Sequence, residues 1–328
     1  MTNQKSGKTL NYKIVNLRAL CIILVVLAHS IIIYNGNWNL YATTQSSIIL
    51  KYLCNLIYIF HMPLFFSISG YLAYYSYKKV DSYKTFALKK AVRLLIPFII
   101  FGLFWMIPIR FIANYSGYQD TNLATIIAKL LIGTDSGHLW FLPCLFLIFC
   151  VHLLLIRHVK NTKVQVAIII TLFLIGHFAP LMAGNVLVNL TWFHLGYLIN
   201  KHRIDQSKKH AWVLLAASIL GVIVYFVAES LFSNTYILRA IKYFDCFFII
   251  MTAYKLVSRR QSKILNSISD LSFGIYLFHS PLIYLSFNYL PEINPYLMLL
   301  LNFAGFGSVA AGLTAIVKKT KIKMIIGE

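Results

Sequence analysis

Apolar stretches long enough to cross a lipid bilayer recur throughout this chain of 328 residues. A helix needs about 20 consecutive apolar residues to span the bilayer core, and its backbone hydrogen bonds must close internally. Ten stretches come near that length: 15–34, 50–74, 92–113, 138–157, 164–182, 184–200, 211–231, 237–257, 268–288 and 295–316. The sequence predicts an all-α, polytopic membrane bundle of about ten helices. Nine or eleven spans also fit, because the sixth stretch is short and the turn at Ala183 and Gly184 is tight.

The composition agrees with a membrane protein and argues against a soluble one. Hydrophobic residues make up 59% of the chain and charged residues 12%, which is too apolar for a soluble domain of this length. The longest loop, about 111–137, is too short for a second domain. We therefore expect one membrane domain over 1–328 with short tails at 1–13 and 317–328. The five cysteines are dispersed, so neither a disulfide framework nor a metal site is expected. No bound cofactor is expected either.

The position of the basic residues predicts an orientation in the membrane. The net charge is +21, and 24 of the 30 Lys and Arg residues precede the first stretch or follow every second one. By the positive-inside rule, both termini lie in the cytoplasm and the chain is a multi-pass protein of the cell membrane. Nucleic acid is not an expected partner, because the chain has no soluble module with a basic face and stacking aromatics.

The first stretch carries two ionisable residues on one face. His29 follows Arg18 by eleven residues, which in a helix puts both side chains in the same direction, about 16 Å apart along the axis. Ionisable groups within a membrane helix usually mark a functional site. His61 lies at a similar depth in the second stretch, beside Pro63, which can bend that helix. We expect His29 and His61 to meet inside the bundle.

A basic cluster stands where the third stretch begins. It consists of Lys89, Lys90 and Arg93. Such residues can bind an anion, or they can serve only the positive-inside orientation.

Other ionisable residues in the predicted helices can have a structural role instead of a functional one. Asp245 is placed well within a helix, where we expect it to pair with Lys242 or Arg239. A hydrogen-bonded packing role also suits several histidines taken singly: His177, His194 and His279.

At these residues the chain resembles the integral-membrane acyltransferase-3 family, whose members transfer acyl groups, usually acetyl, from a coenzyme A thioester to carbohydrate. Arg18 and His29 match the family's Arg-x10-His pattern in the first helix. Lys90-Ala91-Val92-Arg93 is similar to its Arg-x-x-Arg motif in the third. The Lys at the first position keeps the charge but loses the planar guanidinium that binds phosphate through two hydrogen bonds.

Three longer strings resemble one branch of that family, the fucose acetyltransferases of Nod factor and similar polysaccharide O-acetyltransferases. These strings are 60–71, 138–142 and 272–279. The resemblance extends from the first helix to the ninth, and it implies a bacterial setting.

The resemblance implies a membrane-bound O-acyltransferase that moves acetyl from acetyl-CoA, the cosubstrate, to a hydroxyl of a cell-surface carbohydrate or lipid-linked glycan. Another short acyl group such as succinyl is an alternative donor. The donor phosphates are expected on the cytoplasmic side, where charge-assisted hydrogen bonds can hold them. The residues for this role are Lys89, Lys90, Arg93 and Arg18.

His29 is the expected general base for the attacking sugar hydroxyl. His61 is expected to be either a second proton-transfer group or the donor that stabilises the tetrahedral oxyanion. A transient acyl-imidazole is the alternative chemistry. Further substrate contacts are predicted on the acceptor side, where aromatic rings can stack on a sugar: His138, Trp140, Tyr276 and His279.

Two other classes of function are alternatives to an acyltransferase. A proton-coupled transporter or flippase of a glycan-related substrate would use intramembrane His and Arg as a proton relay, and it would move its substrate without consuming acyl-CoA. A receptor or scaffold without chemistry would leave the shared face of Arg18 and His29 unexplained.

Overall fold

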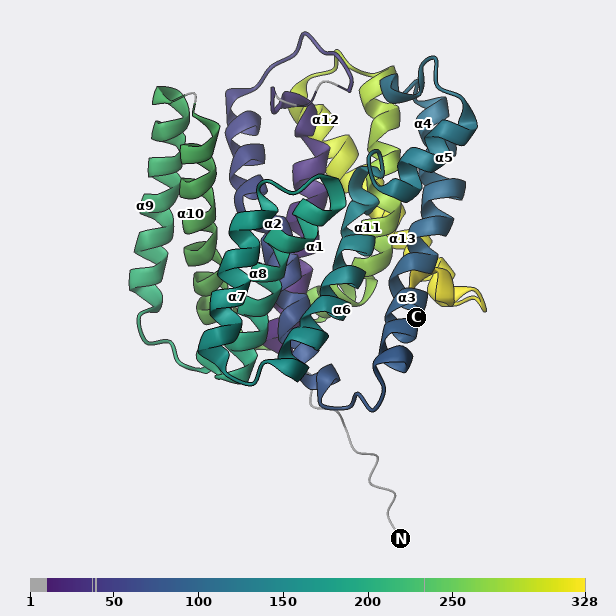
Figure 1. Cartoon of the computed structure of the whole chain (residues 1–328). Coiled ribbons are helices and arrows are strands. Elements are labelled where there is room, and N and C mark those ends of the chain that lie inside the picture. The colour runs from purple at the N-terminus through teal and green to yellow at the C-terminus, as the bar shows by residue number, and fades with distance from the viewer. Residues whose placement is uncertain (1–10, 37, 39, 233, 328) are drawn as a thin grey trace.

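The computed structural model describes residues 11–36, 38, 40–232 and 234–327, and within them the chain is helical without a strand (Figure 1). Ten helical rods form a bundle, as the sequence predicts. Eight are single helices: α1 (Tyr12–Ser30), α2 (Ile48–Tyr77), α6 (Phe141–His158), α7 (Thr162–Gly176), α8 (Leu181–Lys201), α9 (Ala211–Leu231), α10 (Thr235–Leu256) and α11 (Lys263–Tyr289). The short helix α5 (Leu123–Ile132) lies in the connection before α6.

The other two rods are each interrupted by a wider π-helical turn. α3 (Tyr83–Phe101) continues through Gly102–Met106 into α4 (Ile107–Ile112), and α12 (Pro295–Leu300) continues through Leu301–Phe306 into α13 (Gly307–Lys318). The first turn ends two residues before Pro108, whose missing N–H cannot complete the regular helical ladder.

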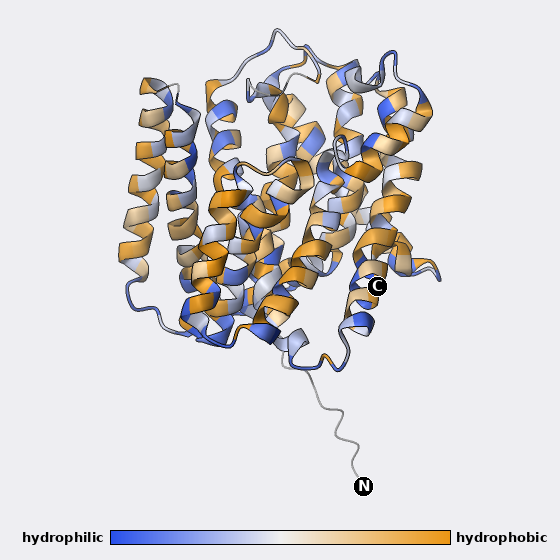
Figure 2. Cartoon of the chain, viewed as in Figure 1, coloured by the Kyte–Doolittle hydropathy of each residue, from blue (hydrophilic) through white to orange (hydrophobic). Residues whose placement is uncertain are grey.

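The bundle has the dimensions and surface of a membrane protein. By length and composition, six described segments can cross a membrane: Tyr12–Ser30, Ile48–Tyr77, Tyr83–Ile112, Leu123–His158, Ala211–Leu231 and Pro295–Lys318. Figure 2 shows hydrophobic residues along the helices and hydrophilic residues mainly at their ends and in the loops. The predicted all-α membrane bundle is confirmed.

Two details of the predicted boundaries are wrong. The short rod is α7, the fifth, with 15 residues, and the turn that follows it lies at 177–180. Pro180 caps α8 because its ring favours the extended conformation found there and cannot continue α7. Gly184 therefore lies inside α8, where a Cβ atom would come within 2.6 Å of the Ala179 carbonyl oxygen.

The expected N-terminal tail is shorter than 1–13, and its residues 1–10 lie outside the described part of the chain. Lys13 belongs to α1 and is buried. Its ammonium group donates to the Tyr254 carbonyl over 2.7 Å and lies 3.4 Å from the Asp205 carboxylate. This buried ion pair fixes the start of α1 against α10 and the connection after α8. Of the C-terminal tail 317–328, residue 328 also lies outside the described part.

Two glycines let α2 and α8 cross with their backbones in contact. A Cβ on Gly70 would lie 1.8 Å from the Phe193 carbonyl oxygen, and one on Gly196 would lie 1.8 Å from the Ser67 carbonyl oxygen. Small residues at such crossings are the usual means of close helix packing in membranes. The crossing lies about two turns along α2 from His61 and Met62.

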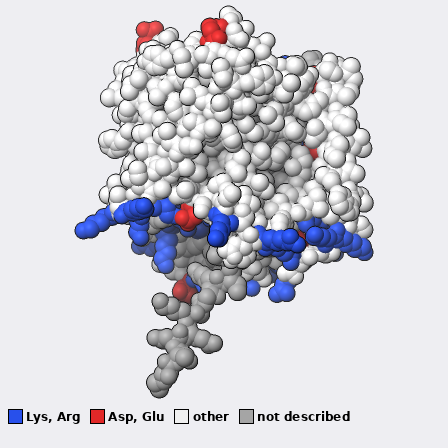
Figure 3. Space-filling model, turned by 180° about the vertical axis from the view of Figure 1, so that it is seen from behind, with Lys and Arg blue, Asp and Glu red and all other residues white. Residues whose placement is uncertain are grey.

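Basic side chains gather at one end of the bundle, which we call the basic end (Figure 3). They come from the segments that connect α2 to α3, α6 to α7, α8 to α9 and α10 to α11, including Lys78, Lys79, Lys160, Arg203, Lys208, Lys209, Arg259 and Arg260. This segregation is what the positive-inside rule requires, and the cytoplasmic position of the basic end stays a prediction.

The expected pairing of Asp245 is wrong. Asp245 is completely buried against Gly221 of α9, and neither carboxylate oxygen has a hydrogen-bond partner among the described residues. Lys242 lines a polar cavity instead.

Candidate active site

Two cavities meet inside the bundle. The larger one, about 600 Å³, lies in the half away from the basic end and is lined by His29, His61 and His138, so we call it the histidine cavity. The smaller one, about 290 Å³, is lined by Arg18, Lys90 and Arg93, and we call it the basic cavity. Met62 of α2 and Tyr276 of α11 line both. The two cavities therefore share a wall in the middle of the bundle.

The basic cavity is lined by three cations and by mainly apolar side chains. Arg18 of α1 donates from Nε to the Ser269 hydroxyl over 2.8 Å, which orients its guanidinium. Lys90 of α3 lies 3.8 Å above the Phe149 ring, and Arg93 follows one turn later. Three of the four predicted anion-binding residues are thus brought together from two helices. Lys89 is exposed, and it is not among the residues that line this cavity.

The walls of the basic cavity beyond these cations are mainly apolar. They include Phe65, Ile68, Leu94, Leu145 and Phe273.

His29 is held in one orientation by His279. His29 Nδ1 lies 2.7 Å from His279 Nε2, and His279 Nδ1 lies 2.9 Å from the Ile275 carbonyl oxygen and 3.0 Å from that of Tyr276. Carbonyl oxygens only accept, so in the neutral rings His279 carries its proton on Nδ1 and accepts at Nε2 from His29. The lone pair of His29 is then on Nε2. His29 lines the histidine cavity, and this nitrogen is available as a proton acceptor.

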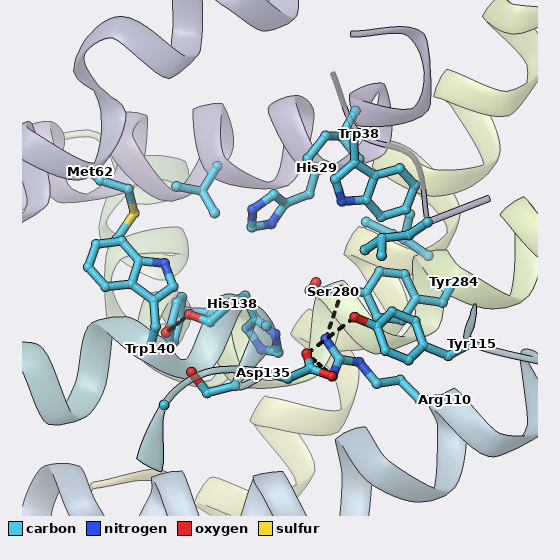
Figure 4. A pocket seen from close by; sticks show the side chains of 18 of the residues that line it. His29, Trp38, Met62, Arg110, Tyr115, Asp135, His138, Trp140, Ser280 and Tyr284 are labelled. Carbon is cyan, nitrogen blue, oxygen red and sulfur yellow. Dashed lines mark hydrogen bonds and ion pairs between the residues drawn. The ribbon is translucent and has the colours of Figure 1, made fainter. Parts of the chain in front are cut away.

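The predicted meeting of His29 and His61 takes a different form. Both line the histidine cavity (Figure 4 labels His29). His61 Nδ1 lies 2.9 Å from the Ile57 carbonyl oxygen, one turn earlier in α2. Its ring packs edge-on against Tyr58, 4.7 Å between centroids, and Tyr58 in turn stands 6.5 Å from His29. A neutral His61 therefore also has its lone pair on Nε2, which suits it to accept a proton rather than to donate to an oxyanion.

The residues predicted for the acceptor side divide into two groups. His138 and Trp140, in the turn before α6, line the histidine cavity together with Tyr276. The Tyr276 hydroxyl donates to the His138 carbonyl oxygen, which ties that turn to α11. His279 is completely buried behind His29 and lines neither cavity. Its position is that of a residue that orients His29.

A buried arginine in the histidine cavity was not among the predicted site residues. Arg110 of α4 is 1% exposed, and its guanidinium lies 2.8 Å from the Asp135 carboxylate (Figure 4). It also stands 4.2 Å over the Tyr115 ring and donates to the Tyr284 hydroxyl over 3.5 Å. Burial raises the pKa of the Tyr115 hydroxyl, which keeps it protonated as a donor to Asp135 at 3.2 Å. An Arg near the far end of the predicted stretch 92–113, away from the basic cluster at its start, is the sequence signal that points to it.

The π-helical turns of the two interrupted rods lie beside this site. In the first turn, Trp105 donates from its indole N–H to the Phe278 carbonyl oxygen over 3.1 Å, next to His279 in α11. In the second turn, Asn302 is buried, accepts from the Ser286 hydroxyl and donates to the Ser30 carbonyl oxygen over 3.2 Å. Both turns thus bind the helices that hold the His29–His279 pair, in agreement with the frequent occurrence of π-turns at functional sites.

The fold and the two adjoining cavities define a multi-pass helical membrane protein with an internal site rich in histidine. The family profile described as "acyltransferase domain", of the acyltransferase-3 type, matches residues 11–318. The chain therefore belongs to the acyltransferase-3 family and is a membrane-bound acyltransferase. No curated protein and no solved structure matches the chain.

Proposed function

We propose that this acyltransferase transfers acetyl from acetyl-CoA, bound in the basic cavity, to a hydroxyl of a cell-surface carbohydrate bound in the histidine cavity. The observation that carries the proposal is the shared wall at Met62 and Tyr276, with an oriented His29 on the histidine side. Phosphate oxygens of the donor would meet Arg18, Lys90 and Arg93 in the basic cavity. The pantetheine arm would extend along the apolar walls toward Met62.

In this mechanism His29 is the general base. Its Nε2 accepts the hydroxyl proton as the sugar oxygen bonds to the thioester carbonyl carbon; the C–S bond then breaks, and the proton passes to the leaving thiolate of coenzyme A. Such help is typically worth ~10²–10⁴-fold in rate. Because donor and acceptor can occupy adjoining cavities together, direct attack is preferred here over an acyl-imidazole intermediate.

The remaining roles follow from position. His61, which lines the histidine cavity and has its lone pair on Nε2, is a second proton acceptor. Trp140 offers an aromatic face and His138 a polar edge to the sugar. The basic end faces the cytoplasm, where acetyl-CoA is available, and the histidine cavity lies in the half that faces outward.

The test measures release of free coenzyme A from acetyl-CoA by the purified protein in lipid nanodiscs, with a crude bacterial glycan extract as acceptor. The wild type should show glycan-dependent release, and His29→Ala should lose at least ~10²-fold. His158→Ala is the matched control, because His158 is an exposed histidine at the end of α6.

Three outcomes count against the proposal. Full activity in His29→Ala would refute the role of His29. Glycan movement across the membrane without coenzyme A release would favour a transporter or flippase. Neither release nor binding of acetyl-CoA would overturn the proposed donor.

A further inference from the structure

A third cavity adjoins the histidine cavity on the side of α9 and α10. This side cavity has a volume of about 310 Å³. Ile32, Trp38 and Tyr58 line both it and the histidine cavity. α9 and α10 stand as a pair at the edge of the bundle, next to α2 (Figure 1). The side cavity therefore extends the space around His29 laterally, toward this pair.

The side cavity contains one carboxylate and one ammonium whose hydrogen-bonding groups are unused within the described part of the chain. Glu229 of α9 and Lys242 of α10 line it and are half-buried. Their opposite charges attract each other across the cavity, but neither forms a hydrogen bond or a close ion pair with another described residue. Half-buried charged groups that lack hydrogen bonds are costly, and a ligand that supplies the missing hydrogen bonds removes that cost. The two groups thus indicate a polar ligand.

The chemistry of the lining indicates what that ligand is. One carboxylate and one ammonium give the cavity no net charge, which favours a neutral ligand over a phosphate or an acidic group. Asn55 accepts from Asn35 through Oδ1, which leaves its Nδ2 as a further donor. The rings of Trp38, Tyr58 and Tyr225 complete the lining. Donors and acceptors set among aromatic faces are what a sugar, with hydroxyls at its rim and apolar C–H faces, requires.

We propose that the side cavity is a second sugar-binding subsite, so that the acceptor is an oligosaccharide or polysaccharide rather than a single sugar unit. This inference rests on the proposed function. The unit to be acylated lies beside His29, and the neighbouring unit occupies the side cavity, with the linkage passing Trp38 and Tyr58. Glu229 accepts from the hydroxyls of that neighbouring unit and Lys242 donates to them.

The experiment compares acceptors of increasing length. A glycan extract that supports transfer is partially hydrolysed and separated into mono-, di- and tetrasaccharide fractions, and each is assayed with saturating acetyl-CoA on the protein in nanodiscs. For the wild type, kcat/KM should rise at least tenfold from monosaccharide to disaccharide. Lys242→Ala and Glu229→Gln should remove most of this gain through a higher KM with kcat unchanged, because a subsite remote from the reacting atoms contributes uniform binding. Their monosaccharide kinetics should match the wild type.

Arg239→Ala is the matched control, because Arg239 is an exposed cation one turn earlier on α10 and does not line the side cavity. Lys242→Gln keeps the bulk and a donor, and it separates a binding effect from misfolding. Equal kcat/KM for all lengths in the wild type would overturn the second subsite while leaving the acyltransferase intact. Equal losses of kcat/KM on monosaccharide and disaccharide in Lys242→Ala and Lys242→Gln would also overturn the second subsite. Absence of transfer to every fraction and to the intact extract would overturn the proposed function itself.

Discussion

Replacement of His279 by phenylalanine tests whether this residue acts only through His29. His279→Phe keeps the volume of a completely buried ring but removes the acceptor for His29 Nδ1. A buried donor left without a partner costs about 1–3 kcal/mol, and each 1.36 kcal/mol is tenfold in rate. The hydrogen bond from His29 Nδ1 to His279 stabilises His29 most when its ring becomes an imidazolium in the transition state. We therefore expect kcat to fall about 5- to 150-fold with KM for acetyl-CoA unchanged, since His279 lines neither cavity.

The assay is steady-state release of coenzyme A, for His279→Phe, His29→Ala and the double variant. Residues that act as a unit are not additive, so the double variant should be no slower than His29→Ala alone. His279→Gln is the matched control, because its side-chain oxygen can still accept from His29, and it should recover part of the rate. Additive losses in the double variant, or a higher KM with kcat intact, would show that His279 acts independently of His29.

Two further predictions concern the donor cavity and the helix crossing. Lys90→Ala should raise KM for acetyl-CoA about tenfold, because a charge-assisted hydrogen bond contributes about 1.5 kcal/mol. Lys89→Ala, the control, should not change this KM. Equal effects of the two substitutions would contradict the basic cavity as the phosphate site. Gly196→Ala should destabilise the protein by about 1–3 kcal/mol, because the added methyl group overpacks against the Ser67 carbonyl. The measurement is the melting temperature in nanodiscs, and Gly312→Ala is the control because a Cβ atom there meets open space. An unchanged melting temperature in Gly196→Ala would refute the tight crossing.

The helices could be predicted because each one appears in the sequence as a long apolar stretch bounded by polar residues, Gly or Pro. All ten predicted stretches correspond to rods. The positions that failed were set by local chemistry: Pro180 rather than Gly184 determines where α8 begins. Arg18 and His29 were predictable as a pair because both lie on one helix, where periodicity fixes their relation.

The partner of His29 could not be predicted in the same way. His29 and His279 are 250 residues apart in the chain, and only the packing of α11 against α1 brings them together. His61 was the nearest histidine along the chain, and it lines the same cavity without a hydrogen bond to His29. The link between Arg110 and Asp135 likewise depends on how the connection through α5 folds back over α4. Sequence periodicity describes one helix at a time, and these contacts lie between helices.

The shared wall at Met62 and Tyr276 has a consequence for how an acyl group would cross the bilayer. A transporter must alternately open to each side, and therefore has to rearrange its helices in every cycle. Here the donor and the acceptor would approach from opposite sides and remain in place, and only the acyl group would change position. The acyl group would pass from donor to acceptor as its ester bond to the sugar forms and its thioester bond to coenzyme A breaks. The free energy of thioester cleavage would drive this transfer. The enzyme would then need neither an ion gradient nor a rocking motion, and turnover would be strictly vectorial.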